Sequence, residues 1–340
     1  MLPVLSRLVR AALVAALVIP LPALATAEPV NLKLSFFTSD RSLIYRGLIK
    51  PFVDAVNDEG SGLVHVDVFF SGAISSEQNR QPQLVADGTV DLALVVPGRS
   101  PQRFYDTTVM ELPGLFRDSD EATAMYLRLA ENGTLAGYGD FIVIGVYVSD
   151  PEDIHSRKPI ASLADLKDLR IRVNNQVEAD VLQRFGAIPV LLAINRTTEA
   201  VSNGSIDGAT APPSVLSAFG IGRVATHHFM IGVGGVPVAL LMNRKTFASL
   251  PPQAQSIIRK YSGAWLCERS VKQFHVWDRE ALAALKADPR RTVVFPDAAD
   301  TKAIHAVYRD VIAAFAASST HNRELLDRVR AEMAKLRSGG

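Results

Sequence analysis

The order of strand and helix patterns near the N-terminus most constrains the fold of this 340-residue chain. Residues 32–37 and 64–69 have strand patterns, and residues 90–96 are almost all apolar, as in a strand that is buried on both faces. Between these strands, residues 44–56 place apolar side chains every four positions, and residues 77–87 form a second helical stretch. This β-α-β-α-β order predicts an α/β fold with helices on both sides of a sheet.

The middle of the chain predicts a second domain and a connection between the two. A buried strand at 141–148 is followed by the polar stretch 151–159, which is typical of a crossover between domains. Farther along, only Gly263 interrupts a helical composition that extends over 252–287, which predicts one rod about 50 Å long. Since that length exceeds one small domain, we expect the helix to brace two domains.

The first 27 residues have the three parts of a cleavable export signal. Arg7 and Arg10 form the positive segment, residues 11–19 form an apolar segment too short to span a bilayer, and Ala27 ends an Ala-x-Ala cleavage site. The alternative is a buried N-terminal helix. We predict cleavage after Ala27 and a periplasmic location. No later segment has 18 uninterrupted apolar residues, so no further membrane insertion is expected.

Charge and cysteine content exclude two classes of function. Removal of the signal takes away its two arginines and leaves 34 basic and 35 acidic residues, a formal net charge of −1. Without a basic excess, the chain lacks the electrostatic footprint of a protein that binds nucleic acid. The single cysteine, Cys267, cannot form an internal disulfide, and we expect a buried, inert thiol rather than a nucleophile.

The sequence contains no recognisable catalytic or cofactor motif. It lacks a phosphate-binding loop, a Gly-x-Ser-x-Gly elbow and a His-Glu-x-x-His helix, and its glycine runs at 220–222 and 232–235 lack the dinucleotide fingerprint. The adjacent His227 and His228 point to opposite faces of a strand and make a poor metal chelate, so we expect a surface role for them. We therefore predict that the protein is not an enzyme and holds no cofactor or metal.

Arg172 is the strongest candidate for binding a ligand. Arg170 and Arg172 share one face of a strand at 168–173, because side chains alternate with period two. One interpretation is that both arginines are solvated on an edge strand. The other is that Arg172, nearer the carboxyl end where ligands sit in open α/β sheets, holds a carboxylate through two parallel hydrogen bonds.

Two other charged residues are weaker candidates. Arg99 lies in the Pro97-Gly98-Arg99 loop, just after the buried strand at 90–96, and faces either a cleft or solvent. Glu77 begins a helix, where its charge suits the helix dipole whether or not it contacts a ligand.

Several motifs together resemble the DctP-type substrate-binding proteins of tripartite ATP-independent periplasmic (TRAP) transporters, in the right order over nearly the whole chain after the signal. The motifs are Val85–Ala93, Glu111–Phe116, Leu166–Val173, Gly186–Val190, Gly204–Gly208, and Met242–Lys245 with Leu250-Pro251. The resemblance implies a two-domain α/β binding protein with a cleft between the domains and a long helix that contacts both. It implies a first domain at 28–148 plus 237–276 and a second at 149–236 plus 277–340.

The resemblance also implies that Arg172 holds the substrate carboxylate while the other domain closes over it. Ala211 stands where the family has an asparagine that helps bind the ligand, and Ile194 stands where it often has an aromatic side chain. These departures argue against sialic acid and C4-dicarboxylates and suggest an apolar or aromatic monocarboxylate. The ligand-binding residues predicted in this way are Phe37, Glu77, Pro97, Gly98, Arg99, Arg172, Ile194, Ala211 and Pro212.

The predicted function is capture of a small organic acid outside the cytoplasm and its delivery to TRAP membrane subunits. Closure of two domains around the anion excludes water and strengthens the ion pair. A binding protein for an ATP-driven importer or a sensor kinase is the alternative, since a fold alone does not define a partner. An exported hydrolase is less favoured, because the sequence has no recognisable set of catalytic residues.

Overall fold

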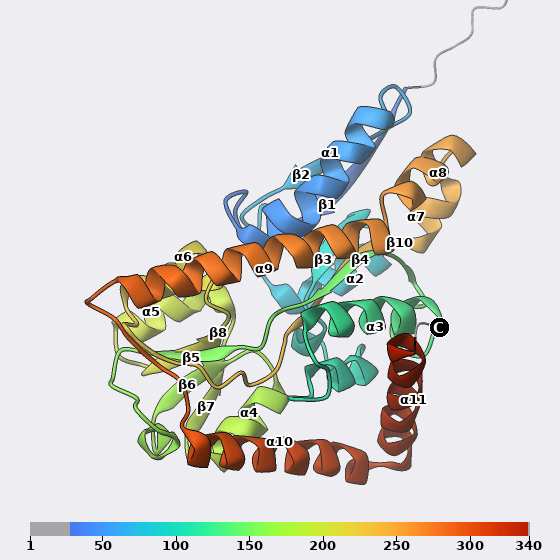
Figure 1. The fold of residues 1–340 in the computed structure, drawn as a ribbon. Coiled ribbons are helices and arrows are strands. Elements are labelled where there is room, and N and C mark those ends of the chain that lie inside the picture. The colour runs from blue at the N-terminus through green and yellow to red at the C-terminus, as the bar shows by residue number, and fades with distance from the viewer. Residues whose placement is uncertain (1–27, 339–340) are drawn as a thin grey trace, which may run out of the picture.

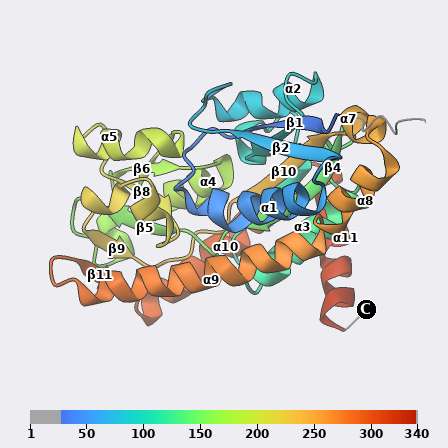
Figure 2. The ribbon, with the colours of Figure 1, turned by 90° about the horizontal axis from the view of Figure 1, so that it is seen from above.

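The computed structural model describes residues 28–338, so the predicted export signal at 1–27 lies outside the described residues. The chain forms two β-sheets with flanking helices, and the long helix α9 (Ala264–Ala287) runs beside both, as Figures 1 and 2 show. The predicted α/β architecture with a bridging helix is confirmed.

The first sheet has the strand order β2-β1-β3-β10-β4. Its strands are β1 (Val30–Ser35), β2 (Val64–Phe69), β3 (Leu92–Val95), β4 (Phe141–Val148) and β10 (Pro237–Asn243). The first three are parallel, as the β-α-β-α-β pattern predicts, whereas β10 is antiparallel to both β3 and β4. Strand β3 is therefore central, and all four of its residues are buried.

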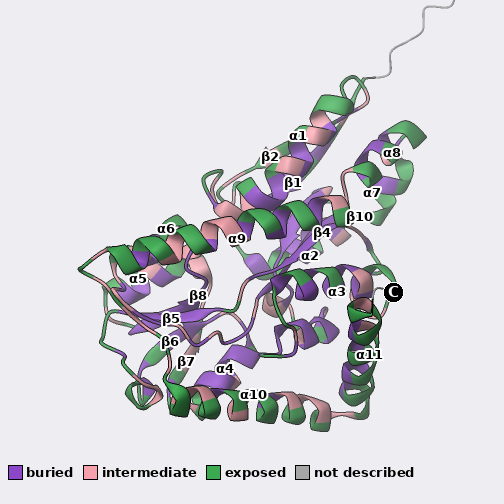
Figure 3. Ribbon diagram, viewed as in Figure 1, coloured by how far each residue is buried: buried purple, intermediate pink, exposed green. Residues whose placement is uncertain are grey.

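Helices cover both faces of this sheet. They are α1 (Lys50–Glu59), α2 (Gln81–Ala86), α3 (Ser119–Glu131), α7 (Arg244–Ser249) and α8 (Pro252–Lys260). Leu92 and Leu94 of β3 pack into a core with α1, α8 and α9, whereas Ala93 and Val95 pack into a second core with α2 and α3. Figure 3 shows the buried sheet between helices whose outer faces are exposed. The apolar run at 90–96 therefore reflects a strand with a core on each side.

The second sheet has the strand order β11-β9-β5-β8-β6-β7. Its strands are β5 (Asp153–Ser156), β6 (Arg170–Val173), β7 (Ile188–Leu191), β8 (Gly208–Ala211), β9 (His227–Phe229) and β11 (Thr292–Val294). Strands β6, β7 and β8 are parallel, and the helices α4 (Gln176–Arg184), α5 (Thr197–Ser202) and α6 (Val215–Ala218) follow them along the chain. The carboxyl ends of these three strands therefore meet at one edge of the sheet.

The chain ends in two long helices, α10 (Ala298–Ser318) and α11 (Thr320–Arg337). Helix α10 packs against α4, whereas α11 packs against α3, beside the first sheet. Two hydrogen bonds from Arg337 to the carboxylate of Glu121, at 2.6 and 2.8 Å, hold α11 there. The predicted limits assign α11 to the second domain, whereas α11 packs against α3 beside the first sheet. The domain limits stay a prediction.

The prediction of one helix over 252–287 is wrong, because α8 ends at Lys260 and α9 begins at Ala264. Between them Gly263 has φ 62° and ψ −133°, a conformation open mainly to glycine. Its N–H donates to the carbonyl oxygen of Ile144 in β4 at 2.8 Å, so a contact with the sheet takes the place of a helical hydrogen bond. Helix α9 is about 36 Å long and contacts β4 and α3 as well as β11.

Two crossover segments connect the sheets, one between β4 and β5 and the other between β9 and β10. They lie side by side, because Ser149 N–H donates to the Val236 carbonyl at 3.1 Å and Glu152 N–H to the Gly234 carbonyl at 2.8 Å. Val233 N–H returns a bond to the Glu152 carbonyl at 2.7 Å. The predicted crossover at 151–159 thus contains Glu152 at its start and continues into β5.

We predict that Gly208→Ala destabilises the protein by about 1–3 kcal/mol. A Cβ at Gly208 would lie 2.4 Å from the backbone oxygen of His155, so β5 and β8 would have to separate. Gly139→Ala is the matched control, because no described atom lies within 4 Å of its Cβ position. Urea unfolding measures both changes. Equal free energies of unfolding for the two variants would contradict the packing of β5 on β8.

Candidate functional site

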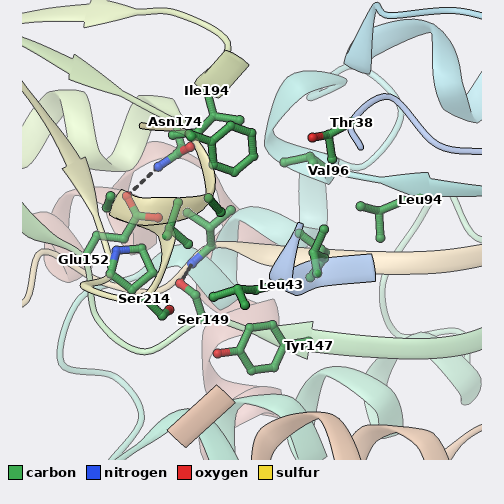
Figure 4. A pocket seen from close by; sticks show the side chains of 18 of the residues that line it. Thr38, Leu43, Leu94, Val96, Tyr147, Ser149, Glu152, Asn174, Ile194 and Ser214 are labelled. Carbon is green, nitrogen blue, oxygen red and sulfur yellow. Dashed lines mark hydrogen bonds between the residues drawn. The ribbon is translucent and has the colours of Figure 1, made fainter. Parts of the chain in front are cut away.

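A cavity of about 120 Å³ lies between the two sheets and is lined by residues from both. The lining begins where strands end: Phe37 lies just beyond β1, Val96 directly after β3, Asn174 directly after β6 and Pro212 directly after β8. Figure 4 shows Thr38 and Val96 on one side of the cavity and Asn174 and Glu152 on the other. The carboxyl ends of strands from both sheets thus form one site.

The wall of the cavity is mainly apolar. Four aromatic rings line it, those of Phe37, Tyr147, Phe219 and Phe274, and the last is on the bridging helix α9. Tyr147 and Phe274 stack with their ring centroids 4.2 Å apart. An apolar cavity of about 150 Å³ holds benzene, and this space, at about 120 Å³, is close to that size.

Arg99 is the only basic residue among the described residues that line the cavity. It ends a 3₁₀ turn at Pro97–Arg99, and its guanidinium Nη1–H reaches the carbonyl oxygen of Asn174 across the site at 3.4 Å. Burial lowers the pKa of Arg99 somewhat, and the nearby Glu77 acts in the opposite direction. The guanidinium remains a cation at neutral pH, because arginine has an ordinary pKa above 12.

Arg172 lies directly behind this wall and is only 1% exposed. Its Nε–H donates to the carbonyl of Leu192 at 2.8 Å, one Nη–H to the carbonyl of Thr210 at 3.2 Å, and the other to Oδ1 of Asn174 at 2.6 Å. A guanidinium has five N–H donors, so these bonds leave two. Asn174 lines the cavity and separates Arg172 from it.

Two carboxyl groups accompany the buried guanidinium. The amide of Asn174 donates to Oε2 of Glu152 at 2.5 Å and to Oε1 of Glu178 at 3.1 Å, and the hydroxyl of Thr210 donates to Glu178 at 2.5 Å. Burial raises the pKa of both carboxyls, well above the ordinary value for Glu152, while Arg172 lowers both. The arginine is therefore compensated within the protein, and Glu152 presents a carboxyl that favours its protonated form to the cavity.

Five of the nine predicted ligand-binding residues line the cavity, and they are Phe37, Arg99, Ile194, Ala211 and Pro212. Gly98 and Glu77 line a neighbouring hollow of about 480 Å³, which shares Arg99 with the cavity. There Glu77 approaches Arg196 of the other side at 3.6 Å, an exposed ion pair. Pro97 is buried in its turn and lines neither space. Arg172 lies behind Asn174, as described above.

Sequence reasoning missed several polar residues of the wall: Gln78, Ser149, Glu152, Asn174 and Ser214. Asn174 could have been found, because it follows the strand of Arg172 at its carboxyl end, where the same rule predicts ligand contacts. Glu152 and Ser149 lie in a crossover, and their position depends on hydrogen bonds to a segment far away in the sequence. The sequence gives no local signal for those bonds.

The prediction of a surface role for both histidines is wrong for His228, which is fully buried in β9. The ring of His155 lies between the Ala211 carbonyl, at 2.9 Å from Nε2, and Nδ1 of His228, at 2.8 Å. Since a carbonyl only accepts, Nε2 of His155 carries the proton and its Nδ1 accepts from His228. The parallel pairing of β9 with β11 covers His228.

The prediction for Cys267 is confirmed, since the residue is buried and burial raises the pKa of its thiol to about 12. Over residues 28–338, no three His, Cys, Asp or Glu side chains are grouped so that they could hold a metal ion. The helices in that range also include none with the length and apolar character needed to cross a membrane.

Residues 34–319 match the protein family described as "Bacterial extracellular solute-binding protein, family 7" (DctP). Among characterised proteins, the chain is similar to the C4-dicarboxylate-binding periplasmic protein DctP of Rhodobacter capsulatus. The two are 23% identical over 270 residues, which cover 75% of this chain and 78% of the relative.

Two solved structures share the fold. A TRAP solute-binding protein from Rhodoferax ferrireducens T118, in complex with copurified benzoate, is 25% identical and superposes with a TM-score of 0.81, covering 90% of this chain and 98% of its own. A TRAP periplasmic solute-binding protein from Bordetella bronchiseptica, with bound (R)- and (S)-mandelate, is 23% identical with a TM-score of 0.79, covering 91% and 100%. The similarity to the Bordetella bronchiseptica protein, at 23% identity, shows a shared fold alone.

We predict that acidification below pH 6.5 removes stability that the buried histidine pair contributes. Burial lowers the pKa of His155 to about 3 and that of His228 to about 4. Between the unfolded value of about 6.5 and these values, the unfolded chain binds protons that the folded protein does not. The pair's contribution to the free energy of unfolding therefore decreases as the pH is lowered through this window.

Urea unfolding of His228→Gln at pH 7 and pH 4.5 measures this contribution. The variant should lose less stability over the interval than the wild-type protein, because one of the two shifted groups is gone. His65→Gln, at an exposed position of β2, is the matched control and should follow the wild-type protein. The same pH dependence in His228→Gln and in the wild-type protein would contradict the prediction.

Proposed function

The chain belongs to family 7 of the bacterial extracellular solute-binding proteins, and we propose that its ligand is an aromatic monocarboxylate that it delivers to the membrane subunits of a TRAP transporter. It is a solute-binding protein of the TRAP type, a class whose solved members bind organic acids such as benzoate and mandelate. The proposal includes a periplasmic location after cleavage at Ala27 and the absence of enzymatic activity.

The composition of the cavity wall is the observation that supports an aromatic monocarboxylate as the ligand. Four aromatic rings and one basic side chain line a space of about 120 Å³, which suits one ring and one carboxylate. A dicarboxylate would bury a second negative charge without a second cation in the wall, and an unpaired buried charge is costly. A sugar acid would bring several hydroxyl groups that need hydrogen-bond partners. The mainly apolar wall offers few such hydrogen-bond partners.

In the proposed complex, Arg99 attracts the carboxylate from the first domain and Arg172 supplies positive charge from the second. The two N–H groups of Arg172 that no described residue accepts lie behind Asn174. Rotation of that amide would bring the ligand within their reach. The apolar wall excludes water, which strengthens the ion pair. Arg99 and the Glu77–Arg196 pair already span the two sides, so they favour the closed arrangement once a ligand is held.

A ligand panel tests the proposed function. Calorimetry of the purified protein should detect benzoate, phenylacetate or mandelate at micromolar concentration, and succinate and glucuronate should bind at least about a hundredfold more weakly. A ligand that binds only the native state also raises the melting temperature. Tight binding of succinate or glucuronate, with no binding of any aromatic acid, would show that the ligand class is wrong.

We predict that Arg172→Lys weakens aromatic-acid binding by a hundredfold or more. A charge-assisted hydrogen bond contributes about 1.5–3 kcal/mol, and lysine keeps the charge but cannot reproduce the planar fork. Arg170→Lys is the matched control, because Arg170 is exposed on the same strand. Melting temperatures of both variants separate lost folding from lost binding. Near-native affinity in a folded Arg172→Lys protein would defeat the role assigned to the guanidinium.

A further inference from the structure

Ser214 has a buried hydroxyl in the wall of the cavity whose oxygen accepts no hydrogen bond from the described residues. The residue lies between β8 and α6, is 2% exposed and lines the cavity with Ser149 and Tyr147 (Figure 4). Its backbone N–H donates to Oδ1 of Asp278 on α9 at 2.9 Å, which fixes its position. Its O–H also points to the Asp278 carboxylate, because a side-chain hydrogen bond with Ser214 lowers the pKa of Asp278. Among residues 28–338, however, no group donates a hydrogen bond to its Oγ.

A role in capping the following helix does not account for this serine. A serine at the N-cap usually adopts extended backbone angles, and its oxygen accepts from an N–H of the first turn. Ser214 has helical angles, φ −61° and ψ −32°, and its side chain makes no such bond to α6. The hydroxyl oxygen accepts no hydrogen bond from the described residues, and unmet capacity of a buried polar group costs stability, so a contact with the ligand is the more economical explanation of a serine here.

The surroundings of the hydroxyl define what it can bind. Asp278, only 7% exposed, lies directly behind it. Burial raises the pKa of Asp278 to about 6, so it is mostly ionised at neutral pH. A second carboxylate on the ligand would be repelled here, whereas a neutral group that donates a hydrogen bond would not. The carboxylate of Asp278 therefore favours an O–H donor.

We propose that Ser214 is a specificity-determining residue that accepts a hydrogen bond from a hydroxyl group on the ligand's aromatic ring. The preferred ligand is then a hydroxylated aromatic monocarboxylate, with its carboxylate toward Arg99 and its hydroxyl toward Ser214. This inference rests on the proposed function, because it needs the ring in the cavity. A site that bonds a ligand hydroxyl discriminates against the analogue that lacks it, because its own polar group is then left unpaired.

Calorimetry of the wild-type protein and Ser214→Ala tests the proposal with benzoate, its three monohydroxy isomers, the matching methoxybenzoates and isophthalate. In the wild-type protein, at least one hydroxy isomer should bind about tenfold or more tightly than benzoate. Its methoxy analogue should lose that gain, and isophthalate should bind more weakly than benzoate. In Ser214→Ala the ratio of the hydroxy isomer's affinity to that of benzoate should fall to near unity. Ser202→Ala, exposed on α5, is the matched control and should keep the gain.

The outcomes separate this inference from the proposed function. If benzoate binds but no hydroxy isomer gains affinity, or if Ser214→Ala keeps the gain, the role of Ser214 is overturned and the proposed function stands. A methoxy analogue that equals its hydroxy isomer would also overturn it, since the ether donates no hydrogen bond. If no aromatic monocarboxylate binds at all, both proposals fall together.

Discussion

Burial of the Arg172 guanidinium is the constraint on which the second sheet and the cavity both depend. A buried charge is tolerated only where it is paired and hydrogen-bonded, and its partners here come from the ends of several strands. The Leu192 and Thr210 carbonyls and the Asn174 amide therefore hold the guanidinium in place. Loss of one partner would leave a buried N–H donor without an acceptor, which links the shape of the ligand site to the stability of the domain that carries it.

The site divides the recognition of a small acid between different physical effects. Aromatic and aliphatic side chains offer a water-poor space with the dimensions of one ring, and burial of apolar surface there contributes roughly 25 cal/mol per Å². Charge comes from Arg99 at the wall and from Arg172 behind it, with Glu152 beside Arg172, whereas the carboxylate of Asp278 lies behind Ser214. We infer that this gradient of charge orients the ligand.

Local patterns predict the parts of this protein that depend on local physics. The buried strand at 90–96 and the carboxyl-end rule point to a cleft position for Arg99, which lines the cavity. The predictions that fail depend on distant partners. The Ile144 carbonyl captures Gly263 and interrupts the long helix, and β11 buries His228 from a part of the chain that follows α9. The burial of Arg172 could not be predicted from the local sequence either, because Glu152 and Glu178, the two carboxyls beside it, come from separate elements.

The paired crossovers have a consequence for how a ligand leaves. Ser149 and Glu152 both belong to the β4–β5 crossover, one of the two backbone segments that join the sheets, and their side chains also line the cavity. Ligand binding and the stiffness of the connection between the two sheets thus depend on the same few residues. Evolution of a new substrate preference at these positions would change residence time as well, so that selectivity and the rate of handover to a receptor would evolve together.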